Sequence, residues 1–261
     1  MTLVDLAIRA YARGQTDRRY LAEFARRVAR DAWTARDVRR TRPERVVAHS
    51  LAARRTFAAA KSVGARTVLV LDLPLFRALH RDLDHAAAVW PDRAFLRRFR
   101  APSWAIARQE AERVLADVIL VRGPYARSIC IADGIAPQRL AAQPAKPPRV
   151  VAPPAQPTNR IRLAGLAAAR HGIDTALEVA RLTGKTLVVR IGDGTEPANL
   201  RDLGVATDDG PVDAIICPAI CEAYAPELEI TGIPVIASPM ASADGTGPDP
   251  YDARAFAAAL R

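Results

Sequence analysis

The sequence predicts an α/β protein of two units, each built on a parallel sheet. Short apolar runs alternate with longer segments of helical periodicity, which is the pattern of consecutive βαβ units. Half of the 261 residues are hydrophobic but only 5% are aromatic, which suits strands and helices built from Ala, Val, Leu and Ile. Six prolines in 143–157 divide the chain, because such a segment cannot be helical. We therefore expect an N-terminal domain over 1–142, a stiff linker over 143–157 and a C-terminal domain over 158–261.

The N-terminal domain is expected to open with a helical extension over 1–45, where apolar residues recur at helical spacing and no strand comes first. The elements expected after it are a strand at 46–49, a helix at 51–63, a central strand at 67–74, helices within 75–115, a strand at 118–121 and a helix at 125–133. Those expected in the C-terminal domain are strands at 161–166, 186–190, 214–217 and 234–237, helices at 173–182 and 251–261, and a short acidic helix between Pro226 and Gly232.

Charge differs sharply between the two halves. Residues 1–145 carry 27 Lys and Arg against 14 Asp and Glu, whereas 146–261 carry 11 against 14. A basic half suits an anionic partner such as a membrane surface or a phosphate-bearing substrate, although arginines spread over several helices also suit ordinary solvated faces. The sequence shows no recognition helix, aromatic-bearing sheet face or zinc module, so we expect no nucleic-acid partner.

Three cysteines, Cys130, Cys217 and Cys221, lie in apolar surroundings and predict buried, reduced thiols of a cytosolic protein. The last two have no second pair of ligands nearby, so no metal site is expected. No apolar stretch approaches the roughly 18 residues that span a bilayer, and 1–14 has no signal-peptide core. These observations favour a cytoplasmic protein and leave open a peripheral attachment at the inner face of the membrane.

Three polar residues, His49, Asp72 and Glu222, lie at or just after the ends of expected strands, where ligands of parallel sheets bind. His49 either contacts a ligand or is structural, and Asp72 either orients a substrate hydroxyl or caps the next helix. Glu222 comes just after the strand at 214–217. Glu227 falls in the first turn of the short acidic helix, where the helix dipole favours a carboxylate.

The stretch over 214–238 resembles the donor-binding signature of family-4-like glycosyltransferases, which have the two-Rossmann (GT-B) fold. That signature runs from a strand through Pro-Ser and Glu-Gly-Phe-Gly to a second Glu eight positions after the first, and then to Gly-x-Pro-Val-Ile-Ala. Here Cys217-Pro218 and Gly232-Ile-Pro-Val-Ile-Ala-Ser238 place Glu222 and Glu227 on the two glutamates. The two are only five positions apart, so about three residues of the phosphate-facing loop are missing and alanines replace its glycines.

Further matches follow in the family's order: His49-Ser50, Asp72, 112–117, Gly134-Ile135, 165–172 and 192–194. The family's turn Gly-Arg-Leu-x-x-x-Lys-Gly grips the nucleotide diphosphate with its two cations. When the two glycines of this motif are aligned with Gly165 and Gly172, its two cationic positions correspond to Leu166 and His171. Arg170 is next to the histidine. The resemblance therefore implies two Rossmann-like domains facing a cleft, in a shortened member whose motifs have degenerated.

The resemblance implies transfer of a sugar from a nucleotide-sugar donor to a hydroxyl acceptor, a glycan or a lipid-linked glycan, in glycan or polysaccharide biosynthesis. The family's chemistry is retaining and metal-independent, and needs no cofactor besides the nucleotide-diphosphate sugar as co-substrate. Three residues at strand ends would serve catalysis: Glu222, Asp72 and His49. Glu227 would hold the ribose, Arg170 and a protonated His171 the diphosphate beside Gly165, and Gly192 and Asp193 the nucleoside.

An alternative is a protein that no longer catalyses and serves as a binding or assembly partner. It is favoured by the absence of a first strand and by Leu71 and Leu166, which stand where the family has histidine and arginine. The shortened loop between the two glutamates points the same way. Both functions remain open on the sequence alone.

Overall fold

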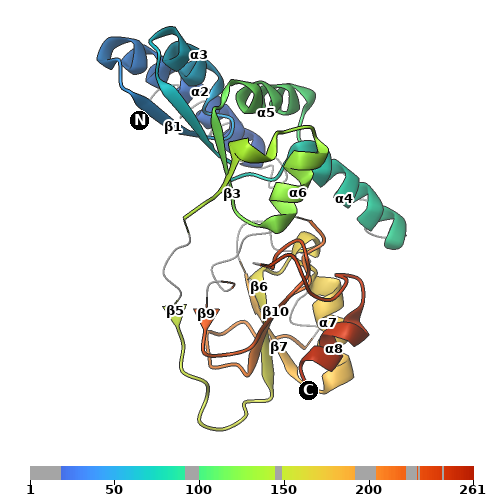
Figure 1. Ribbon diagram of the computed structural model, residues 1–261. Helices are drawn as coiled ribbons and strands as arrows, with labels where there is room; N and C mark the ends of the chain where they lie inside the picture. The colour runs from blue at the N-terminus through green and yellow to red at the C-terminus, as the bar shows by residue number, and fades with distance from the viewer. Residues whose placement is uncertain are drawn as a thin grey trace. The chain divides into compact units, whose positions relative to one another are not determined.

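The computed structural model describes residues 19–91, 100–144, 149–191, 204–221, 228, 230–242 and 244–261. It divides into two compact units, and Figure 1 shows the helices and strands of each. Unit 1 comprises Met1–His80, Arg98–Arg122 and Ala126–Gln143, and unit 2 comprises Arg81–Arg97, Gly123–Tyr125 and Pro144–Arg261. The sequence did not predict that Arg81–Arg97 and Gly123–Tyr125 belong to the second unit.

Unit 1 alternates helices with four strands. Its elements are α2 (Arg19–Thr41), β1 (Arg45–His49), α3 (Arg54–Ser62), β2 (Arg66–Val70), the start of α4 (Phe76–Val89), α5 (Ser103–Leu115), β3 (Val118–Val121), α6 (Pro124–Ala132), a 3-10 turn (Pro137–Arg139) and β4 (Leu140–Ala142). All neighbouring strands pair in parallel, in the order β1-β2-β3-β4. The parallel sheet predicted for this half of the chain is thereby confirmed.

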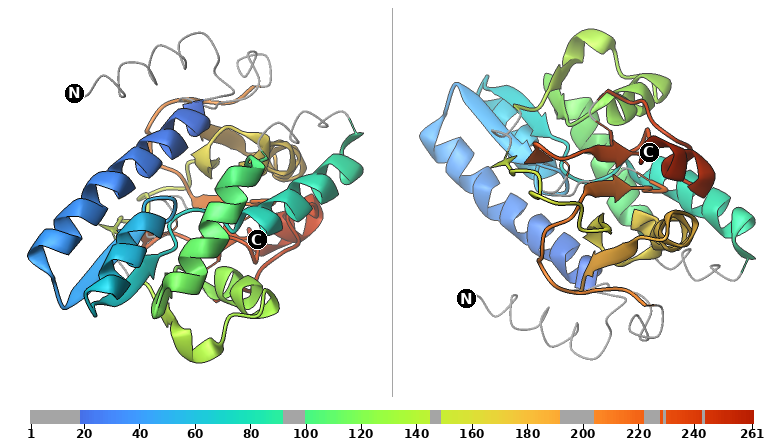
Figure 2. Two further views of the ribbon diagram at one scale, coloured as in Figure 1. Left: turned by 90° about the horizontal axis from the view of Figure 1, so that it is seen from above. Right: turned by 90° about the horizontal axis from the view of Figure 1, so that it is seen from below.

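Each strand of unit 1 lies beside the next strand of the sequence, so every crossover advances in one direction. Because such crossovers are right-handed, the connecting helices gather on one face of the sheet. The core confirms this, since Phe57 of α3 and Cys130 of α6 are fully buried with Leu69 and Ile119 of the strands. Figure 2 shows α3 between α2 and α5 in the view from above.

Helix α3 begins at Arg54, later than expected from the sequence. The delay follows from Leu51, whose φ of 67° lies in the left-handed region that a helix cannot use. The segment Ser50–Ala53 therefore forms a turn between β1 and α3. The N–H groups of Leu51 and Ala53 in this turn are hydrogen-bonded to a buried carboxylate, Glu112.

Unit 2 holds a second parallel sheet. Its elements are β5 (Arg149–Val150), β6 (Arg160–Leu166), a 3-10 turn (Ala169–His171), α7 (Ile173–Thr183), β7 (Thr186–Arg190), β8 (Ala214–Cys217), β9 (Ile230–Thr231), β10 (Val235–Ala237) and α8 (Ala253–Ala259). The main sheet has the order β10-β8-β6-β7, with parallel pairing throughout. The chain moves from β6 to β7 on one side and returns to β8 on the other, which makes the carboxyl ends of β6 and β8 a topological switch point.

The acidic helix predicted to run as far as Gly232 is wrong at its end. Ile230 and Thr231 form β9, which pairs in parallel with β5. The chain is held there because Val151 N–H donates to Thr231 O over 2.8 Å, and a Cβ on Gly232 would lie 2.1 Å from Val151 O. Two β-branched residues before a glycine suit such a strand better than a last helical turn. Residues 222–227 and 229 lie outside the described part of the chain.

Cys130, Cys217 and Cys221 are all buried, and none of the three forms a disulfide, as predicted. In the described ranges, no helix combines the length and the apolarity that crossing a bilayer requires.

Candidate functional site

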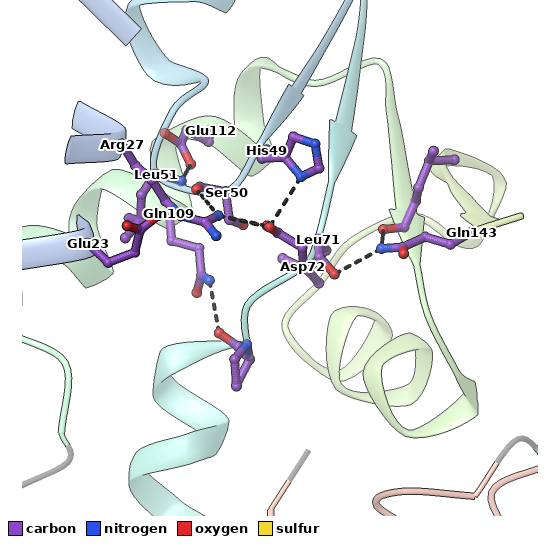
Figure 3. A network of polar contacts seen from close by, with 12 residues as sticks. Glu23, Arg27, His49, Ser50, Leu51, Leu71, Asp72, Gln109, Glu112 and Gln143 are labelled. Carbon is purple, nitrogen blue, oxygen red and sulfur yellow. Dashed lines mark hydrogen bonds and ion pairs between the residues drawn. The ribbon is translucent and has the colours of Figure 1, made fainter. Parts of the chain in front are cut away.

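The carboxyl edge of the unit 1 sheet carries a cluster of His49, Asp72 and Arg27 (Figure 3). Asp72 accepts two hydrogen bonds from Arg27 Nη1, at 2.9 and 3.1 Å, and its Oδ2 lies 3.2 Å from His49 Nδ1. The same Arg27 nitrogen donates to Ser50 O over 3.1 Å. The Asp72 side chain is only 18% exposed, whereas that of His49 is 60% exposed. The sequence indicates His49 and Asp72 as two separate candidate residues, and the structure brings them together.

A histidine whose Nδ1 is held by a carboxylate presents its Nε2 to a substrate, which is the arrangement of a general base or a hydroxyl-positioning group. Arg27 pairs with the Asp72 carboxylate and holds it in place, and no pattern in the sequence indicates this third member. The alternative that Asp72 caps the next helix does not hold, because Phe76 N–H at the start of α4 donates instead to Gln109 Oε1 over 3.0 Å. Asp72 therefore orients His49.

The turn between β1 and α3 is closed by a buried carboxylate. Glu112 of α5 accepts hydrogen bonds from the N–H groups of Leu51, Ala53 and Arg54, at 2.7, 3.0 and 3.1 Å. Burial raises the pKa of Glu112, while these N–H groups and Arg108 lower it. A helix N-terminus is a ready anion site, and here the protein's own carboxylate occupies it. These three N–H groups are therefore not available to bind an external phosphate.

Asp31 of α2 accepts hydrogen bonds from two further N–H groups in the first turn of α3. It accepts from the N–H groups of Arg55 and Thr56, both at 2.8 Å, and it pairs with Arg108. Sequence reasoning missed both buried acids. The only signal was position: each lies on the helix face that also carries the buried apolar residues, where an unpaired carboxylate is rarely tolerated.

The switch point of unit 2 is formed by the turn from Gly165 to Gly172, between β6 and α7. Both glycines have left-handed φ angles, 83° and 79°. A Cβ on Gly172 would lie 1.9 Å from Pro218 O, so the turn is seated directly against the segment that follows β8. Ile220 N–H donates to Arg170 O over 3.2 Å and fixes the same contact. The family motif placed its two glycines at Gly165 and Gly172, and both adopt the left-handed conformation at this turn.

His171 lies beneath this turn as a neutral, buried ring. It is 9% exposed, and its Nδ1 lies 2.9 Å from the N–H of Leu166. Burial lowers the pKa of His171 to about 4, and the neighbouring charge of Arg170 adds to the effect. The expectation of a protonated His171 is therefore wrong at neutral pH. Its ring fills the space under Gly165, where a Cβ would meet Nδ1 at 2.7 Å.

The lowered pKa makes stability depend on pH. The unfolded state binds a proton on His171 below about 6.5 and the folded state only below about 4, so the free energy of unfolding falls as pH falls through this window. The native chain should lose about 3 kcal/mol of stability between pH 7 and pH 4 from this group. Urea unfolding at several pH values measures it. His171→Asn should remove that part of the slope, and an equal slope in the variant would contradict the assignment.

Arg170 is the cation that this turn presents. Its side chain is exposed, and it has no carboxylate partner among the residues that the structure describes. Ser238, at the end of β10, is fully buried and donates through Oγ to Ala219 O over 2.7 Å, which ties the ends of β8 and β10 together. Gly165, Arg170 and His171 thus meet as expected. The other expected binding or catalytic residues of this unit, Gly192, Asp193, Glu222 and Glu227, lie outside the described residues.

No family model matches the chain, and no curated protein matches it by sequence. Among solved structures, the chain is similar to the lipopolysaccharide outer core galactosyltransferase WaaB in its apo form. The alignment covers 91% of this chain and 71% of the WaaB chain, with a TM-score of 0.54 and 17% sequence identity. The chain has the GT-B fold. The two Rossmann-like α/β units that the sequence predicted are those of this fold.

Two other solved structures are less similar. The glycotransferase of kitacinnamycin matches 95% of this chain over 74% of its own, with a TM-score of 0.42 and 14% identity. The UDP-GlcNAc 2-epimerase of Neisseria meningitidis, bound to UDP-GlcNAc, matches 88% over 70%, with a TM-score of 0.41 and 10% identity.

Proposed function

We propose that the protein binds a nucleotide-diphosphate sugar at the switch point of unit 2 and transfers the sugar to a hydroxyl group of a glycan or lipid-linked acceptor. The observation that carries the proposal is the glycine turn 165–172, which is seated against Pro218 and presents Arg170. Glycines let a diphosphate approach the backbone closely, and an exposed guanidinium offers it charge-assisted hydrogen bonds. The similarity to the WaaB galactosyltransferase supports the same function.

The residue roles are those that the resemblance to family-4-like glycosyltransferases implies. Arg170 holds the diphosphate, Glu227 the ribose, Glu222 the sugar hydroxyls, and Gly192 with Asp193 the nucleoside. In a retaining, metal-independent transfer the departing diphosphate accepts the acceptor's proton. His49, oriented by Asp72, then positions the acceptor hydroxyl, and the site acts through positioning and charge stabilisation.

Arg170→Ala is expected to weaken the binding of a nucleoside diphosphate by about 10- to 100-fold, because a charge-assisted hydrogen bond contributes about 1.5 to 3 kcal/mol. Isothermal calorimetry with a panel of nucleotides and nucleotide sugars measures this. Arg254→Ala, at an exposed arginine on α8, is the matched control and should bind as the native chain does. Absence of binding by the native chain at millimolar concentration would overturn the proposal.

A second candidate function is that of a nucleotide-sugar-binding assembly partner that no longer catalyses. It is favoured by the single cation at the glycine turn, since Leu166 is uncharged and His171 is neutral. A departing diphosphate then has less stabilisation than two cations give, and loss of one such group typically costs about 3 to 4 kcal/mol of transition-state stabilisation. Donor binding without transfer or donor hydrolysis would establish this function, and turnover of any donor would exclude it.

A further inference from the structure

One face of the unit 1 sheet carries no helix among the described residues of that unit. The crossovers place α3, α5 and α6 on the other face, and burial along β1 follows from this. Val46 and Ala48 point into the core, whereas Val47 is 58% exposed between them. The side chains on this open face are Arg45, Val47 and His49 of β1, Arg66, Val68 and Val70 of β2, Val118 and Leu120 of β3, and Ala141 of β4.

The open face is continuous from strand to strand. Val47 is in register with Val68, which is in register with Val118, so three valines form one row across the sheet. Parallel sheets are normally covered on both faces, because their strands are apolar on both sides. The four strands hold 5, 5, 4 and 3 residues. At a rise of about 3.3 Å per residue and a spacing of about 4.8 Å between strands, they present about 270 Å². A helix about 10 Å across, or two such helices, would cover this area.

The charges on the open face indicate what kind of helix fits. Arg45 and Arg66 are exposed and face each other in register at the amino ends of β1 and β2, and neither forms an ion pair with another described residue. These two cations favour a docked helix whose C-terminal end lies over the amino ends of β1 and β2. The helix C-terminus has a partial negative charge, and carboxylates in its last turns would pair with the two guanidinium groups.

We propose that the open face docks an amphipathic helix of another protein. The apolar side of that helix lies on the row of Val47, Val68 and Val118, and its acidic C-terminal turns lie against Arg45 and Arg66. A second copy of this chain fits the face less well. It would bring the same two arginines and a net charge of +10 against an equally basic partner.

A photo-crosslinking residue placed at Val47 of the full chain, produced in the native host, tests the proposal. The expected adduct joins Val47 to a different protein, and mass spectrometry of the crosslinked peptide should place it in a helix with carboxylates near its C-terminal end. The same residue at Val114, which is 78% exposed on α5, is the matched control and should not give this adduct. An adduct within the same chain or to a second copy, or no adduct at all, would overturn the proposal.

Charge reversal tests the orientation of the docked helix. The double variant Arg45→Glu/Arg66→Glu should lower the adduct yield about tenfold, because like charges then meet. Both side chains are exposed, so the fold should persist, and the urea midpoint of the variant checks this. Exchange of the partner's mapped carboxylates for Lys should restore the yield. An adduct yield that is unchanged by both sets of substitutions would contradict the assigned orientation and with it the proposal.

Discussion

Gly172→Ala should cost about 3 kcal/mol or more of unfolding free energy, because a left-handed φ of 79° is strained for alanine and the new Cβ would lie 1.9 Å from Pro218 O. The added methyl meets a backbone carbonyl, which cannot rotate away as a side chain can. The variant should therefore separate the β6–α7 turn from the end of β8. Urea unfolding followed by circular dichroism measures the loss, and calorimetry should show that nucleotide binding is lost with it.

Gly184→Ala is the matched control, since it isolates strain from contact. Gly184 has a similar φ of 65° at the end of α7, but no atom lies within 4 Å of its added Cβ. Its substitution should cost only about 1 kcal/mol. Equal losses for the two variants would mean that the contact with Pro218 contributes nothing to holding the turn.

Glu112→Ala should destabilise unit 1 by about 3 to 5 kcal/mol, because it removes one partner of a buried ion pair with Arg108 and leaves three N–H groups of the β1–α3 turn without an acceptor. Glu112→Gln retains an amide oxygen as acceptor and should lose less. Urea unfolding of the full chain measures both.

Glu110→Ala on the same helix is the control for Glu112. Glu110 pairs with Arg77 nearer the surface, with 34% of its side chain exposed, so its loss should cost less than about 1 kcal/mol. If Glu112→Ala were no more destabilising than Glu110→Ala, the buried carboxylate would not be what closes the start of α3.

Much of the fold was predictable because its strands are short apolar runs between polar boundaries. Val118–Val121, Thr186–Arg190 and Ala214–Cys217 appear where the sequence placed them. β4 was missed, since three residues with one buried side chain show no periodicity. The strand Ile230–Thr231 was missed because its partner, Arg149–Val150, lies about 80 positions away in the sequence, and local pattern does not reveal such pairing.

The location of the candidate site was predictable from the sequence, but the protonation state of His171 and the ion pair of Arg27 were not. Strand ends identified His49, Asp72 and the glycine turn, because the carboxyl edge of a parallel sheet is a general location for ligands. The neutrality of His171 and the role of Arg27 depend on burial and on contacts 45 positions apart, which no spacing rule reveals. The open face of unit 1 was equally hidden, since an apolar strand reads the same whether one of its faces is covered or both are.

The strand order of unit 1 also bears on how the protein folds. Each of its strands pairs with the next one along the chain, so every pairing is available as soon as the following strand has been synthesised. The main sheet of unit 2 differs, because β8 pairs with β6 and not with β7, the strand that precedes it in the sequence. Unit 1 is therefore suited to form strand by strand at the ribosome, while unit 2 gains its central pairing only when most of the chain has been made.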